Sequence, residues 1–217
     1  MEHQGAKRDR ERCAIIVMTR YPEEGKVKTR LIEHLGEDGA THLHQKMAEH
    51  TISTLEPLCD IQTADLWVFF SGGSAEKMQS WLGERFEYRP QQGDNLGSRM
   101  AHAFKHIFAA GYNRAVMLGT DCPDIEGATV VKALNSLRSA DVALGPAEDG
   151  GYYMIGINEL HPDLFRNINW GSAKVLSQTV EIVKNLNLTP AYLPPLRDID
   201  IPEDLESIRG TFLLPGT

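Results

Sequence analysis

The chain has 217 residues, of which 41% are hydrophobic and 24% are charged, and its formal net charge is −8. This composition is typical of a globular protein, and we expect one domain over residues 12–210 after a disordered tail over residues 1–11. An acidic chain with no basic block is a poor match for nucleic acid or an anionic membrane, and no apolar run is long enough to span a bilayer. The three cysteines are widely spaced and indicate no disulfide framework, so a cytoplasmic location is expected.

Short apolar runs alternate with helical patterns through the first two thirds of the chain. Buried strands are predicted at residues 13–18, 66–70, 115–118, 141–145 and 152–157, with weaker extended pieces at 86–88 and 191–193. Helices are predicted at residues 29–35, 38–57 (closed by Pro57), 75–82, 100–108, 130–137, 173–186 and 203–209. The alternation predicts an α/β fold with a mainly parallel sheet and helices on both faces. The irregular stretch 158–172 is expected to form a flap or a strand hairpin over the site.

Asp121 directly follows a buried strand, within Gly119-Thr-Asp-Cys-Pro123. Open parallel sheets bind ligands at the carboxyl ends of their strands, and a carboxylate there could hold Mg²⁺ or Mn²⁺, which bridge to diphosphate oxygens. The alternative is that Asp121, or more suitably Asp124, caps the following helix. Farther along the chain, Asp200 is free to act as a second metal ligand, whereas Asp204 could cap the last helix or lie in its first turn.

The loop at residues 20–31 follows the first predicted strand and carries a local group of cations. Gly25 permits close backbone approach, and Lys26, Lys28 and Arg30 could hold a diphosphate together with backbone N–H groups. The loop is neither a Walker loop nor a dinucleotide fingerprint. A solvated charged loop is the alternative.

Three other features could contribute to a site. Residues 91–98 contain amides and glycines that could read the edge of a base, or they form a polar turn. Asp149, followed by Gly150 and Gly151, could act as a general base or bind sugar hydroxyls, or it lies in a tight hairpin turn without chemistry. Trp170 could be an aromatic group on the acceptor side or an ordinary packed tryptophan.

The order of these segments resembles the bacterial DUF2064 family of the nucleotide-diphospho-sugar transferase (GT-A) superfamily, whose members are often labelled arsenosugar-biosynthesis-type glycosyltransferases. The matching stretches cover nearly all of residues 13–205. They are Pro22, Gly25, Lys28-Thr-Arg-Leu31, Gln92-Gly93, Leu96-Gly97, Arg99-Met100, Gly119-Thr-Asp-Cys-Pro123, Gly145-Pro146, Asp149-Gly-Gly-Tyr-Tyr153, Trp170, Asp198-Ile-Asp-Ile-Pro202 and Asp204-Leu205.

The resemblance implies a single-domain, Rossmann-like GT-A fold with a nucleotide site over the first strands. Asp121 is implied to be the metal carboxylate of the DxD-like position, and Asp200 replaces the second acid that the local Asp-Cys-Pro sequence lacks. Ile201 stands where the family usually has Thr, with little effect expected. The expected nucleotide-binding residues are Arg20, Gly25, Lys28, Arg30, Gln92, Leu96, Gly97 and Thr120. The expected residues on the acceptor side are Gly150, Gly151 and Trp170, with Asp149 as the catalytic residue.

Two reactions fit these expectations. A glycosyltransferase would move a sugar from a nucleotide-diphospho-sugar to a small-molecule acceptor with Mg²⁺ or Mn²⁺. A nucleotidyltransferase would use an NTP and release pyrophosphate, and the Lys28–Leu31 loop also looks like that of guanylyltransferases acting on phospholactate. The Gly-Gly-x-Gly-x-Arg loop of many sugar nucleotidyltransferases is absent, which favours the glycosyltransferase. A non-catalytic nucleotide-binding protein is disfavoured because Asp121 and Asp200 are both present. A homodimer is compatible with the sequence.

Overall fold

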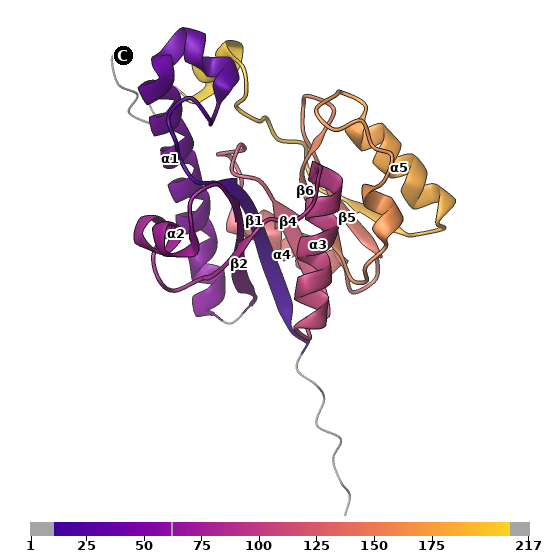
Figure 1. The fold of residues 1–217 in the computed structure, drawn as a ribbon. Coiled ribbons are helices and arrows are strands. Elements are labelled where there is room, and N and C mark those ends of the chain that lie inside the picture. The colour runs from indigo at the N-terminus through magenta and orange to yellow at the C-terminus, as the bar shows by residue number, and fades with distance from the viewer. Residues whose placement is uncertain (1–10, 62, 209–217) are drawn as a thin grey trace, which may run out of the picture.

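The described residues, 11–61 and 63–208 of a computed structural model, form a seven-stranded sheet with helices on both faces (Figure 1). The strand order is β3-β2-β1-β4-β6-β5-β7. The strands are β1 Cys13–Arg20, β2 Asp65–Ser71, β3 Glu87–Pro90, β4 Arg114–Leu118, β5 Val142–Pro146, β6 Tyr152–Ile157 and β7 Pro190–Tyr192. Strand β6 is antiparallel to both β4 and β5, and the other neighbouring strands pair in parallel. The expected α/β fold with a mainly parallel sheet is confirmed.

Alternate residues of the central strands pack into two separate hydrophobic layers. The helices are α1 Ile32–Asp60, α2 Ala75–Leu82, α3 Leu96–Ala109, α4 Gly127–Ser136 and α5 Val175–Asn185. Ile15 and Val17 of β1 belong to the layer formed with α1, α2 and α4. Ile16 belongs to the opposite layer, formed with α3 and α5. This period of two explains why the strands read as continuous apolar runs.

Some predicted boundaries were wrong. Helix α1 continues past Pro57 to Asp60, because proline removes one N–H donor but its carbonyl oxygen still accepts the N–H of Ile61 at 3.2 Å. The expected short helix over residues 29–35 is present as the 3₁₀ turn Thr29–Leu31 followed by the first residues of α1, and it ends as expected at Gly36, where the backbone is not helical (φ 72°).

The stretch 158–172 is not a strand hairpin. It contains the 3₁₀ turn η2 (Pro162–Phe165), whose Leu164 and Phe165 are buried in the hydrophobic layer with α3 and α5. In a strand these two adjacent side chains would point to opposite faces, so they could not both be buried in this one layer.

A third, smaller hydrophobic cluster joins distant parts of the sequence. Ile199, Leu205 and Ile208 pack against Leu31 and Leu43 near the start of α1. We call residues 198–208 the C-terminal segment; it includes the 3₁₀ turn η3 (Pro202–Ile208), drawn in yellow beside the indigo start of α1 in Figure 1. Residues 1–10 of the expected tail and residue 209 of the last expected helix lie outside the described residues. No described helix is both long and apolar enough to cross a membrane.

Candidate functional site

A cleft of about 440 Å³ opens where β1, β2 and β4 end, and cations dominate its charged lining. The lining cations are Arg20, Lys26, Lys28, Arg30 and Arg99. The lining carboxylates are Asp121 and Asp200. We call this the cationic cleft. Its charge suits a polyanion such as a diphosphate, since Arg and Lys side chains form strong charge-assisted hydrogen bonds with phosphate oxygens.

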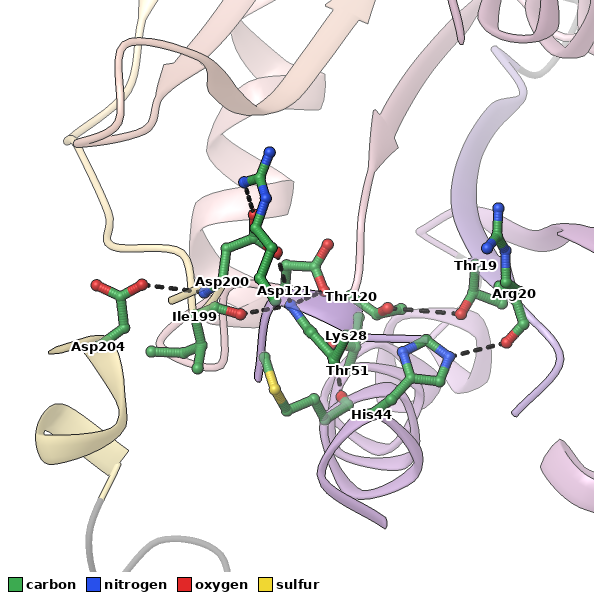
Figure 2. A network of polar contacts seen from close by, with 12 residues as sticks. Thr19, Arg20, Lys28, His44, Thr51, Thr120, Asp121, Ile199, Asp200 and Asp204 are labelled. Atoms are coloured by element: carbon green, nitrogen blue, oxygen red, sulfur yellow. Dashed lines mark hydrogen bonds and ion pairs between the residues drawn. The ribbon is translucent and has the colours of Figure 1, made fainter. Parts of the chain in front are cut away.

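Lys28 connects the two carboxylates of the cleft. Its side chain is only 4% exposed, and its Nζ lies 2.6 Å from Oδ1 of Asp121 and 3.7 Å from Oδ1 of Asp200. Nζ also donates a hydrogen bond to the carbonyl oxygen of Ile199 (Figure 2). The backbone of Lys28 is left-handed (φ 46°, ψ 42°), a conformation that is uncommon for a residue other than glycine and that the surrounding contacts must stabilise.

Asp121 lies in the loop after β4 with half of its side chain, 51%, exposed. Desolvation would raise the pKa of this carboxyl, but the charge and hydrogen bond of the Lys28 ammonium outweigh it and hold the pKa below its usual value. The backbone N–H of Ile199 donates to the carbonyl oxygen of Asp121 at 2.8 Å, so the C-terminal segment is tied to this loop. The alternative that Asp121 or Asp124 caps the next helix is wrong, because α4 begins only at Gly127.

The C-terminal segment brings Asp200 to the other side of Lys28. Asp204 lies in the first turn of η3, and its Oδ2 accepts the backbone N–H groups of Asp200 and Ile201, both at 3.0 Å. These bonds fix the backbone from which the Asp200 side chain projects toward Lys28 and Arg30, and the Arg30 guanidinium forms an ion pair with it. Asp200 is therefore not a free carboxylate, and both of its oxygens face cations.

The chemistry of the two carboxylates fits a divalent metal ion in part. Carboxylate oxygens are the ligands that Mg²⁺ and Mn²⁺ prefer, and Asp121 and Asp200 already converge on one buried cation, the Lys28 ammonium. The described residues contain no group of three or more His, Cys, Asp or Glu side chains placed to hold a metal. A metal ion here would therefore complete its coordination with water and substrate oxygens, as Mg²⁺ usually does when it binds a nucleotide.

A second cavity lies on the other side of Asp121. It consists of a compartment of about 310 Å³ and an adjoining one of about 150 Å³, and Asp121, Asp149 and Gly151 line both. We call these two compartments together the acidic pocket. One carboxylate oxygen of Asp149, Oδ1, accepts the N–H of Gly151 at 2.7 Å, which stabilises the turn between β5 and β6. Asp149 therefore contributes both to a turn and to the lining of the pocket.

Aromatic rings form one wall of the acidic pocket. Tyr152 and Trp170 both line its larger compartment, and their ring centroids are 6.3 Å apart in an edge-to-face arrangement. Cys122 lines the smaller compartment, where burial raises the pKa of its thiol and the charges of Asp121 and Asp198 raise it further. The thiol is therefore protonated near neutral pH and is no nucleophile.

Asp198 is a pocket residue that the sequence did not single out. It lines the smaller compartment together with Asp149 and Asp121. Burial raises the pKa of this carboxyl, and the charge of Asp149 raises it further. Its signal in the sequence is only the cluster of acids at residues 198–204, and no local pattern distinguishes Asp198 from Asp200 and Asp204 in that cluster.

The structure gathers some, but not all, of the expected nucleotide-binding residues around the cationic cleft. Those that line it are Arg20, Lys28, Arg30, Leu96 and Thr120. Gln92 is exposed outside it, and the neighbouring Gln91 lines it instead, with its amide donating to the carbonyl oxygens of Thr19 and Phe69, both at 3.0 Å. Gly25, whose φ of 71° favours glycine, lies beside the carboxylate of Glu37.

Two expected site glycines serve close packing. A Cβ on Gly97 would lie 2.1 Å from the carbonyl oxygen of Phe165, and Gly97 lines neither the cationic cleft nor the acidic pocket. Gly150 has a positive φ of 88°, and a Cβ there would lie 2.4 Å from the carbonyl oxygen of Ala173. Both glycines bring loops together around the pocket.

His44 is a buried residue of the cleft that the sequence patterns did not reveal. It lines the cationic cleft from α1, and its Nε2 lies 2.8 Å from the carbonyl oxygen of Arg20, so Nε2 carries the proton and donates (Figure 2). Burial lowers the pKa of His44. Its neutral ring holds the end of β1 against α1. The spacing with Ala40, Leu43 and Met47 could have placed it on the buried face of that helix.

Comparison with known proteins gives a family and a fold. A family model described as "Uncharacterized protein conserved in bacteria (DUF2064)" matches residues 54–172. A solved structure from Desulfovibrio desulfuricans G20, described as a proposed nucleotide-diphospho-sugar transferase, is 41% identical with a TM-score of 0.86, over 92% of this chain and 87% of that chain. No curated protein matches the chain.

More distant structures share the fold. The 4-diphosphocytidyl-2C-methyl-D-erythritol synthase of Anaerococcus prevotii DSM 20548 aligns with a TM-score of 0.63 at 10% identity, over 93% of this chain and 96% of that chain. The glucosyl-3-phosphoglycerate synthase of Mycobacterium tuberculosis, solved with Mn²⁺, UDP and glucosyl-3-phosphoglycerate, aligns with a TM-score of 0.54 at 13% identity, over 90% of this chain and 75% of that chain.

Proposed function

We propose that this chain, which belongs to the DUF2064 family, uses Mg²⁺ or Mn²⁺ to move a sugar from a nucleotide-diphospho-sugar to a small acceptor. The 41% identical structure from Desulfovibrio desulfuricans G20 supports a transferase of the nucleotide-diphospho-sugar transferase type. The observation that carries the proposal is the position of Asp121, which lines both the cationic cleft and the acidic pocket. A donor whose diphosphate lies in the cleft would place its sugar at this junction, with the acceptor in the pocket.

The residues of the cleft would bind the donor. Arg20 and Arg30 would pair with the diphosphate, as Arg side chains commonly do. Lys28 now neutralises Asp121 and Asp200; a divalent ion bound by these carboxylates would repel its ammonium, which then becomes available to the phosphates. When bound, the metal ion supplies charge stabilisation for the departing nucleotide diphosphate.

Asp149 would act on the acceptor. Its carboxylate lines the pocket beside Asp121 and would accept the proton of an acceptor hydroxyl while the hydroxyl oxygen bonds to the anomeric carbon of the donor sugar. The bond between that carbon and the diphosphate oxygen breaks, and its electron pair leaves with the nucleotide diphosphate. The hydrogen bond that the N–H of Gly151 donates to Oδ1 of Asp149 would keep this carboxylate oriented during the reaction.

The test is a thermal-shift panel of nucleotide sugars, nucleoside diphosphates and NTPs, each with and without Mn²⁺, followed by product analysis. A ligand at about 100 times its Kd stabilises the folded state by roughly 2.7 kcal/mol, enough for a clear rise in melting temperature. The proposal expects metal-dependent shifts with nucleotide sugars and release of a nucleoside diphosphate when an acceptor is added. Release of pyrophosphate from an NTP would instead establish the nucleotidyltransferase.

Two matched variants assign the metal. Asp121→Asn should abolish the metal-dependent part of the thermal shift, because a neutral amide is a poor ligand for Mn²⁺. Asp124→Asn removes the same charge from an exposed position of the same loop that lines neither cavity, and it should behave like the wild type. If both variants keep the full metal-dependent shift, Asp121 is not the metal ligand.

A further inference from the structure

The acidic pocket differs from the cationic cleft in the charge of its lining. Asp121, Asp149 and Asp198 line its two compartments, and none of the described residues lining either compartment is Lys, Arg or His. Among the ion pairs of the described residues, Asp121 pairs with Lys28 of the cationic cleft, which leaves Asp149 and Asp198 as the pocket's own acids. The potential inside this pocket is therefore negative.

The rest of the larger compartment is apolar and aromatic. Met100, Met117 and Leu118 contribute apolar surface from α3 and β4, and Tyr152 and Trp170 add two rings set edge to face. Small-molecule sites of this composition bind an apolar face of the ligand against the rings and orient it through a few polar groups. A sugar or polyol fits, because its C–H face can lie on an aromatic ring while its hydroxyls donate to carboxylates.

A phosphate or carboxylate group does not fit. It would lose its hydration in a cavity that offers no cation among its described lining residues, and it would lie beside carboxylates of the same sign. A metal ion at Asp121 and Asp200 would attract an anion only at the junction with the cationic cleft, and there the donor diphosphate would already neutralise the charge of the metal ion. The charge pattern thus separates two tasks, with anion binding confined to the cleft.

We propose that the acidic pocket binds an uncharged polyhydroxy group, a sugar or polyol without phosphate or carboxylate, and that Asp149 and Asp198 exclude anionic analogues. That this group is the acceptor rests on the proposed function. The preference for neutral ligands stands on the pocket alone, and it holds whichever bond of the nucleotide is broken.

The test uses the full chain and three probes of one sugar skeleton: glucose, glucuronate and glucose 6-phosphate. Binding is followed by NMR on the indole N–H signal of Trp170, which is identified by its loss in Trp170→Phe. Anions that enter only the cationic cleft leave this signal in place. We expect glucose to shift the signal and each anionic probe to need at least about tenfold more ligand for the same shift, a difference of roughly 1.4 kcal/mol.

Charge variants separate the proposal from a purely steric preference. The double variant Asp149→Asn, Asp198→Asn should reduce the tenfold difference to about threefold or less, which is roughly 0.6 kcal/mol. Asp124→Asn, which removes an exposed charge outside the pocket, should leave it unchanged. Equal or tighter binding of an anionic probe to the wild type overturns the proposal, as does an unchanged discrimination in the double variant or a Trp170 signal that no probe moves.

These outcomes are distinct from failure of the proposed function. The nucleotide panel can fail while glucose still binds at Trp170 and the anions do not. Conversely, nucleoside diphosphate release with an anionic acceptor would support glycosyl transfer and refute the neutral pocket.

Discussion

Gly97 is the second residue of α3, and no room exists there for a side chain. A Cβ would lie 2.1 Å from the carbonyl oxygen of Phe165 and 2.8 Å from Nε1 of Trp170. Favourable contacts between carbon atoms are about 3.5–4.0 Å, so in Gly97→Ala the start of α3 or the segment that carries Trp170 must move by roughly 1 Å or more.

The magnitude follows from two opposing effects. Alanine is better than glycine in a helix by up to about 1 kcal/mol, whereas overpacking typically costs about 1–3 kcal/mol. At Gly97 the nearest atom belongs to the backbone and cannot rotate away, so we expect Gly97→Ala to lower the free energy of unfolding by about 1–2 kcal/mol. Gly127, the first residue of α4, is the matched control, because its Cβ would lie 3.5 Å from the carbonyl oxygen of Thr54 and 3.7 Å from Cδ2 of Leu58, which are ordinary contacts. Gly127→Ala should be neutral or slightly stabilising, by up to about 1 kcal/mol.

The assay is urea unfolding followed by circular dichroism, with the NMR signal of the Trp170 indole as a local readout. Gly97→Ala should shift the midpoint to lower urea and move the indole signal, and Gly127→Ala should do neither. A Gly97→Ala protein as stable as the wild type, with an unchanged indole signal, would refute the reasoning, since it would show that residues 165–170 do not rest rigidly on α3.

Three further predictions concern charged groups of the site. In Lys28→Met the pKa of Asp121, measured by carboxyl NMR titration, should rise, and an unmoved pKa would contradict the ion pair. The free energy of unfolding should fall by less than the about 3–5 kcal/mol that removing one partner of a fully buried ion pair costs, because Asp121 is half exposed. Burial lowers the pKa of His44, so the folded state binds fewer protons than the unfolded chain, and the stabilisation linked to His44 is fully present above about pH 6.5 and is lost at lower pH. In His44→Gln the free energy of unfolding, measured by urea unfolding, should therefore fall less steeply with decreasing pH, by up to about 1.4 kcal/mol per pH unit. An equal slope in the variant would exclude His44 as the source of the pH dependence. Because burial raises the pKa of Cys122, iodoacetamide at neutral pH should label it far more slowly in the folded than in the unfolded protein, and comparable rates by peptide mass spectrometry would show an accessible thiolate.

The fold could be predicted well from the sequence because its central strands are buried on both faces. The apolar runs of β1, β2 and β4 have no polar interruption, and the helices between them show clear spacing, so the α/β class followed. The resemblance to the DUF2064 family is confirmed by the family match and by the 41% identical structure. The direction of β6 could not be predicted, since antiparallel and parallel buried strands have the same composition.

The site could be predicted by segment but less well by side chain. The loop after β1 and the loop after β4 were both identified, yet the ion pair between Lys28 and Asp121 depends on folding geometry that no local pattern encodes. Gln91 and Gln92 are identical in chemistry, and only the direction of the backbone after β3 decides which one lines the cleft. Asp198 lies in the pocket because the C-terminal segment docks on α1, a contact between residues far apart in the chain.

The docking of the C-terminal segment also determines when the cationic cleft can form during synthesis on the ribosome. The Lys28 ammonium donates a hydrogen bond to the carbonyl oxygen of Ile199, 171 positions later in the sequence. All seven described strands are therefore synthesised before this carbonyl group, which completes the cleft. At about 5–20 residues per second, a nascent chain exists for many seconds with Lys28 and Asp121 made and their partner still missing. During that interval the chain lacks both the carbonyl oxygen of Ile199 and the carboxylate of Asp200 that surround the Lys28 ammonium in the folded protein, so the cationic cleft is complete only after residue 200 has been made.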